Sequence, residues 1–98
     1  MIVVKIHECG RGRIVALCDE ELIGKKFSEG RLVLDLNSGF YKGEALPKEK
    51  IIALLKTAYI INAVGNESVE LILKNNYVEK GSIIKIKGIP HAQCLVIK

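Results

Sequence analysis

The stretch KEKIIALLKTAYIINAVGNESVELILKN, residues 48–75, decides the fold class that the sequence predicts. Pro47 suits the first position of a helix, and apolar residues at helical spacing predict a helix that continues to about residue 64. The second half of that helix is apolar nearly all round, which indicates burial. Gly65 would end it, and Asn66 would cap a second helix over 67–75. The stretch therefore predicts two consecutive helices that pack as a hairpin.

Strand patterns stand on both sides of this helix pair. Residues 1–8 alternate between apolar and other side chains, and the glycines of CGRGR allow a tight reversal into a partner strand over 13–19. Asp19 would cap one helical turn with Glu20 and Glu21 in its first turn, where the helix dipole favours negative charge. Further strands are predicted over 31–36, 82–87 and 93–98, and 40–46 is predicted as a short strand or an extended loop.

Strands in runs around a pair of helices predict an α+β fold. We expect a mostly antiparallel sheet of about five or six strands, with the helix hairpin packed on one face. No repeat, linker or low-complexity segment divides the chain, so residues 1–98 are expected to form a single domain. An edge of such a sheet could pair with a second copy of the chain, which makes a homodimer one of the expected assemblies.

The composition restricts the classes of function. The 98 residues carry 15 Lys and Arg against 11 Asp and Glu, a net charge of +4, which permits contact with nucleic acid without requiring it. No apolar run is long enough to span a bilayer, and no secretory leader precedes the first strand, so no membrane partner and a cytoplasmic location are expected. Three distant cysteines without a CxxC pair fit reduced thiols rather than a disulfide framework.

Two nucleic-acid motifs are considered and set aside. A helix-turn-helix needs Arg, Lys, Asn or Gln along its recognition helix, whereas the second helix opens with Glu67 and Glu70 and offers only Lys74. The glycines at 10 and 12 would cradle a phosphate only if a helix followed them, and a strand follows. Arg11 and Arg13 nevertheless project from the hairpin tip, where they could contact an RNA backbone.

Metal and thiol chemistry are weakly supported. His7 with Cys9, and His91 with Cys94, would converge only if the two terminal strands paired, and their spacing matches no standard zinc site. No metal and no cofactor are therefore expected. The acidic residues beside Cys18 oppose a thiolate, and Cys94 lies in an apolar strand, so Cys9 has the only plausible setting for a nucleophile.

The segment GIPHAQ, residues 88–93, is the most distinctive polar turn. Gly88 and Pro90 are expected to fix a turn that holds His91 and Gln93 on a stiff frame. Such a frame serves a binding or catalytic site as well as it serves a corner whose polar residues face water, and the sequence favours neither. Asn62 is the polar residue in the apolar half of the first helix, and we expect its amide to bond the backbone near Gly65 rather than to line a site.

These segments together resemble a small archaeal family known as domain of unknown function 424. The resemblance covers nearly the whole chain, and Cys9 and Cys94 lie outside it. It implies an archaeal source and, more loosely, a place in translation or RNA processing. The matching residues are Cys18 to Leu22, Gly24, Lys25, Phe27, Glu29, Gly30, Phe40, Tyr41, Gly43, Glu44, Asn62, Gly65 and Gly88 to Ala92.

Three functions follow as hypotheses. The first is a non-catalytic module that binds RNA or the ribosome in translation, with phosphates meeting Arg11, Arg13, Lys25, Lys26, Lys85 and Lys87. The second is a small enzyme or ligand-binding protein with His91 as acid or base, Asn62 as an orienting amide, and Asp19 or Glu20 as carboxylate partner. The third is a protein–protein adaptor or homodimer that uses an exposed sheet edge. An enzyme is the less favoured of these alternatives.

Overall fold

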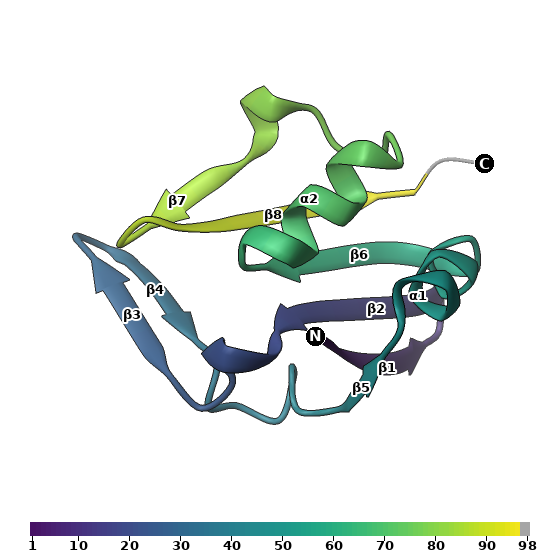
Figure 1. Ribbon diagram of the computed structural model, residues 1–98, viewed down its shortest axis with the longest axis horizontal. Coiled ribbons are helices and arrows are strands. Elements are labelled where there is room, and N and C mark those ends of the chain that lie inside the picture. The colour runs from purple at the N-terminus through teal and green to yellow at the C-terminus, as the bar shows by residue number, and fades with distance from the viewer. Residues whose placement is uncertain (97–98) are drawn as a thin grey trace.

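The computed structural model describes residues 1–96 as a six-stranded sheet with two helices against one face and a separate strand pair against the other (Figure 1). This architecture confirms the α+β class and the number of strands in the main sheet. The elements in chain order are β1 (Ile2–Cys9), β2 (Gly12–Asp19), β3 (Lys26–Glu29), β4 (Leu32–Asp35), β5 (Glu44–Leu46), α1 (Lys48–Leu55), β6 (Ala58–Val64), α2 (Asn66–Lys74), β7 (Ile84–Ile86) and β8 (Ile89–Leu95).

The strand order of the main sheet is β5-β1-β2-β6-β8-β7. Four of its five pairings are antiparallel, whereas β2 and β6 at the centre run parallel. Parallel neighbours need a long crossover connection, and here β3, β4, β5 and α1 all lie within it. The sheet is therefore mostly antiparallel, as expected, but mixed, because its central pair runs parallel.

The predicted helix hairpin is wrong because its first helix stops at half the expected length. Helix α1 ends at Leu55, and the apolar run that follows forms the central strand β6. An apolar run without a polar face fits a buried strand as well as a buried helix, and the β-branched and aromatic residues at 59–61 favour the strand. Strand β6 thus separates α1 from α2, and the two helices are not a hairpin.

The first hairpin agrees with the sequence, and one strand was not expected. Strands β1 and β2 form the predicted hairpin, with Cys9 opposite Gly12 across a two-residue turn. The predicted strand over 31–36 is β4, which pairs with β3, a strand that the sequence did not predict. Only Phe27 is apolar within β3, so no alternation marks it.

Only Gly88 of the GIPHAQ segment lies in a turn, and the other five residues belong to strand β8. The reversal between β7 and β8 is made by Lys87 and Gly88, whose φ angles of +53° and +78° are those of a tight two-residue hairpin turn. Pro90 and His91 lie within β8. The expected last strand over 93–98 therefore begins earlier, and its final two residues lie outside the described part of the chain.

The sheet has two faces with separate cores. On the helix face, Val15 and Leu17 of β2 and Ile61 of β6 pack with buried residues of the helices, namely Ile51, Leu55, Val69 and Ile72. On the opposite face, here called the hairpin face, Ala16, Cys18 and Val64 are covered by Leu22, Leu34, Leu36 and Tyr41. No helix among residues 1–96 is long and apolar enough to cross a membrane.

Candidate functional site

Asp19, at the end of β2, is a buried carboxylate with a structural role. One of its oxygens accepts hydrogen bonds from the Ser68 N–H and hydroxyl, both at 2.8 Å, and the other accepts the Glu67 N–H at 3.0 Å. Asp19 therefore caps α2, not the helical turn that follows it, and no side-chain cap comes from Asn66. Gly65 directly precedes α2 and has a φ angle of +104°, and a Cβ at this position would overlap the Asp19 carboxylate.

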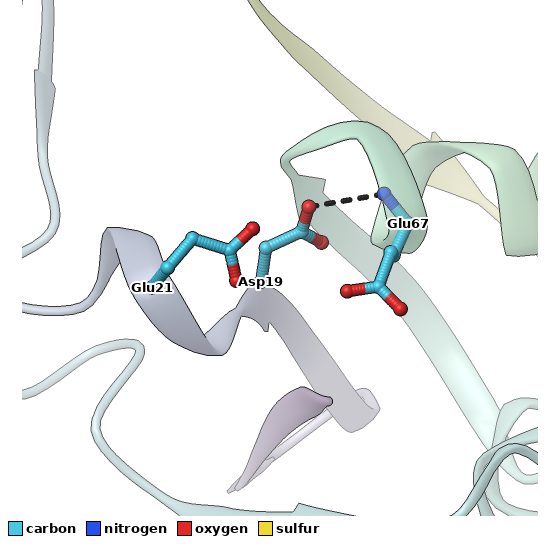
Figure 2. A group of neighbouring side chains, drawn as sticks. All are labelled: Asp19, Glu21 and Glu67. Carbon is cyan, nitrogen blue, oxygen red and sulfur yellow. Dashed lines mark hydrogen bonds between the residues drawn. The ribbon is translucent and has the colours of Figure 1, made fainter.

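Figure 2 shows that Glu21 and Glu67 bring their carboxylates close to Asp19, and oxygen atoms of the three lie within 4.8 Å of one another. Clustered carboxylates are the ligands that hard cations prefer. Here the oxygens of Asp19 are already occupied as the helix cap, and the Met1 ammonium lies 3.5 Å from Glu67. The group is therefore explained by the fold. Sequence reasoning missed it because Glu67 is 48 residues from Asp19.

His91 and Asn62 are brought together on the hairpin face by the pairing of β8 with β6. The His91 Nε2 atom lies 3.4 Å from the Asn62 Oδ1 atom, and both side chains are partly buried. Burial lowers the pKa of His91 below its ordinary value of 6.5, so the imidazole is neutral at pH 7. Asn62 thus contacts a ring nitrogen of His91, in place of the backbone contact expected near Gly65.

The expected carboxylate partners do not join this pair. Cys18 and His91 both pair with Val64, from opposite sides, and their side chains lie on the hairpin face. Asp19 follows Cys18 in β2, so its side chain lies on the other face, where it contacts α2. Glu20 is exposed at the start of a 3-10 turn. Within residues 1–96 no carboxylate hydrogen-bonds to His91, so the expected pairing of His91 with Asp19 or Glu20 does not form.

The thiols are not arranged for catalysis. Burial, reinforced by the charges of Asp19 and Glu21, raises the pKa of Cys18 to about 12. Burial also raises the pKa of Cys94. Cys9 is exposed, and its thiol donates to the Gly12 carbonyl at 2.9 Å.

The two terminal strands are not neighbours, because β2 and β6 lie between β1 and β8. The two His–Cys pairs therefore do not converge on one site. His7 instead stacks on Phe40 with ring centroids 4.5 Å apart, and its Nε2 atom lies 2.9 Å from the Phe40 carbonyl oxygen.

A cleft of about 300 Å³ lies where the β1–β2 hairpin tip meets the start of β6. The guanidinium of Arg13 is oriented by two bonds, from Nε to Glu8 at 2.6 Å and from Nη1 to the Thr57 hydroxyl at 3.2 Å. Gly12 lies so close to Tyr59 that an added Cβ would meet the Tyr59 Cβ at 2.7 Å. The lining residues are Arg11, Gly12, Arg13, Thr57, Ala58, Tyr59 and Val96.

The six cations expected to meet phosphates do not form one patch. Arg13 lies opposite Ala58 at the start of β6. Lys87 lies in the β7–β8 turn, which is near the other end of β6. The Lys87 N–H donates to Glu29 at 2.7 Å. Lys25 and Lys26 lie at the start of β3, and Lys85 lines a groove beside α2. Only Arg11 and Arg13 of the six share one cleft.

Comparison with known proteins gives a family and a fold. The model of a family described as protein of unknown function (DUF424) matches residues 6–97. A crystal structure of an uncharacterized conserved protein from Methanopyrus kandleri is similar, with a TM-score of 0.79 and 24% identity over 99% of this chain and 94% of the other. None of the curated proteins matches. These findings confirm the family resemblance and support the fold.

Proposed function

The chain belongs to the DUF424 family, whose description assigns no function, and we propose from its structure that it is a non-catalytic module that binds single-stranded RNA. The observation that carries this proposal is the cleft with Arg11, Arg13 and Tyr59. Two arginines can contact phosphate oxygens, and an aromatic ring beside them can stack on a base.

The cleft is organised before a ligand arrives. Glu8 and Thr57 accept hydrogen bonds from the Nε and Nη1 groups of the Arg13 guanidinium, which leaves its Nη2 group without a partner among residues 1–96 and available to an anion. Arg11 is exposed on the turn, and no ion pair joins it to another of the described residues. A prealigned guanidinium loses less side-chain entropy on binding than a mobile lysine does.

Two residues that were candidates for catalysis have other surroundings than catalysis would need. Among residues 1–96, the Cys18 thiol is held protonated and His91 has no carboxylate partner. The net charge of +4 supplies the long-range attraction that a polyanion needs. Ribosomal RNA is one proposed source of such RNA, in line with the place in archaeal translation expected from the sequence.

The salt dependence of binding tests the proposal. Fluorescence anisotropy with a labelled single-stranded RNA 12-mer should give a linear fall of log K with log salt, with a slope of about −0.7 for each phosphate contact. The double variant Arg11→Ala/Arg13→Ala should reduce the magnitude of the slope by roughly 1.4. Tyr59→Leu should weaken binding by about tenfold or more without changing the slope.

A matched control removes the same charge elsewhere. Lys25→Ala/Lys26→Ala lowers the net charge equally but lies outside the cleft, so its slope should remain that of the parent chain. No binding at low salt would overturn the proposal, and equal effects of the two double variants would overturn its assignment to the cleft. Capture from an archaeal lysate with and without RNase would then show whether ribosomal RNA is the ligand.

A second candidate function rests on the contact between His91 and Asn62. A neutral imidazole beside an amide, on rigid strands at the half-covered hairpin face, offers donors and acceptors to a small polar ligand. A thermal-shift screen of polar metabolites should find a ligand that stabilises the parent chain and not the His91→Ala variant. Ligands that stabilise both equally would place the site elsewhere.

A further inference from the structure

The outer edge of β8 is paired along only part of its length. Strand β7 pairs with Ile89–His91 and goes no further, whereas β8 continues to Leu95. Figure 1 shows that the two strands diverge after their shared turn. The short β7 thus leaves the outer edge of the second half of β8 without a strand partner among residues 1–96, and this unpaired edge, residues 92–95, is here called the β8 notch.

The hydrogen bonds of β8 identify which backbone groups face this notch. The Pro90 carbonyl accepts the Gly65 N–H at 2.9 Å, and the Val96 N–H donates to the Tyr59 carbonyl at 2.8 Å, so even-numbered residues bond toward β6. Alternate residues of a strand direct their backbone to opposite neighbours. The N–H and C=O groups of Gln93 and Leu95 therefore point into the notch, beyond the last residue that β7 pairs.

The notch lacks the devices that normally protect a sheet edge. Residues 89–96, IPHAQCLV, include no Lys, Arg, Asp or Glu, although 27% of the chain is charged. Pro90 stands in the part that β7 already covers, and Leu95 is 54% exposed. At the opposite edge, β1 carries Lys5 and Glu8. Natural edge strands are usually blocked by charges, prolines or bulges, so an uncharged open edge is typical of one that pairs with another strand.

We propose that a second copy of this chain adds its β8 to the notch, antiparallel and about a two-fold axis, so that the two sheets become continuous. Pairing Gln93 of one copy with Leu95 of the other satisfies all four free groups. The axis then passes beside Cys94, which faces its own counterpart. A register that places Gln93 opposite Gln93 of the other copy is excluded. It would pair Leu95 with His91, whose outward backbone groups already face Ile84 of β7.

A second copy fits this edge better than a charged peptide does. The strand carries no charge, so two identical copies can lie side by side without placing like charges opposite each other. The exposed Leu95 would cover the stem of Gln93 on the hairpin face, and the closed symmetry leaves no further notch for a third chain. This inference stands independently of RNA binding, because the notch does not include Arg11 or Arg13.

Sedimentation equilibrium tests the proposal directly. The parent chain, of 10.8 kDa, should change from monomer to dimer between about 1 μM and 1 mM, as expected for a small interface. Gln93→Pro deletes an outward N–H that no hydrogen bond among residues 1–96 uses, so it should keep the thermal unfolding midpoint within a few degrees and weaken dimerisation by about tenfold or more. Glu8→Pro deletes the equivalent outward N–H at the β1 edge and should leave dimerisation unchanged.

Cross-linking tests the register. In the Cys9→Ser variant, a short bis-maleimide should join two copies through Cys94, and the additional change Gln93→Pro should suppress that product. A parent chain that stays monomeric at 1 mM would overturn the proposal, as would a dimer that Glu8→Pro disrupts and Gln93→Pro does not. A dimer that forms without a Cys94 cross-link would overturn the register centred on that residue.

Discussion

Helices α1 and α2 cover the helix face of the sheet, whereas the hairpin face is covered in part by Leu22, Leu34, Leu36 and Tyr41. On the first face every strand residue near the centre is apolar and buried. On the second, Asn62 and His91 are partly buried and the strand beside them carries exposed side chains. The two faces therefore have different roles. The helix face supplies most of the burial that stabilises the fold, and the hairpin face keeps polar groups on rigid strands within reach of a ligand.

The largest effect is expected from the same truncation made on each face. Ile61 on the helix face is fully buried and Ile84 on the hairpin face is 46% exposed. Ile61→Ala should reduce the free energy of unfolding by roughly 2–5 kcal/mol, and Ile84→Ala should change it by about 0.5 kcal/mol or less. Urea unfolding at low protein concentration measures both. Equal losses would mean that the hairpin face is as closed as the helix face.

A smaller loss is expected where β2 meets α2. Asp19→Ala leaves the two backbone N–H groups of Glu67 and Ser68 without their acceptor and should cost about 2–3 kcal/mol. Ser68→Ala removes only the hydroxyl bond and should cost about 1 kcal/mol. Amide hydrogen exchange at 67 and 68 should accelerate in the first variant. Unchanged exchange there would contradict the capping role.

The smallest effect is expected from protonation of His91. Because burial lowers its pKa below 6.5, the unfolded chain binds a proton more readily than the folded chain does as the pH falls through that value. This contribution to stability is therefore present above pH 6.5 and is lost progressively below it. Urea unfolding between pH 7 and pH 5 should show a shallower fall for His91→Gln than for the parent chain. His7→Gln retains His91 and should keep the steeper fall.

The parts of the fold that the sequence predicted are those governed by local patterns. Alternation over 1–8 and 13–19 marks the β1–β2 hairpin, and the segment between Gly65 and Asn75 marks α2, although Asn66 supplies no cap. The strand β6 was mistaken for helix because its apolar run has no period, and the partner that fixes it as a strand is β2, about 45 residues earlier by their pairing. Long-range pairing, not local propensity, decides this segment.

The candidate site shows the same division. His91 and Asn62 were each singled out by their residue types, but their contact depends on the pairing of β6 with β8, which could not be foreseen while residues 58–64 were read as helix. Asp19 was recognised as a capping residue and assigned to the wrong helix, because the helix that it caps begins 47 residues later. Arg11 and Arg13 were placed at the hairpin tip correctly, but Thr57 and Tyr59 were not associated with them.

The capping of α2 by Asp19 also constrains the order of events during folding. A nine-residue helix is marginal alone, and the acceptor for its first N–H groups arrives only when β2 has been laid beside β6. That parallel pairing closes a loop of more than 40 residues, which is an entropically costly and slow step. We therefore expect α2 to consolidate after the central strands rather than to nucleate them, and truncations within α2 should accelerate unfolding more than they retard refolding.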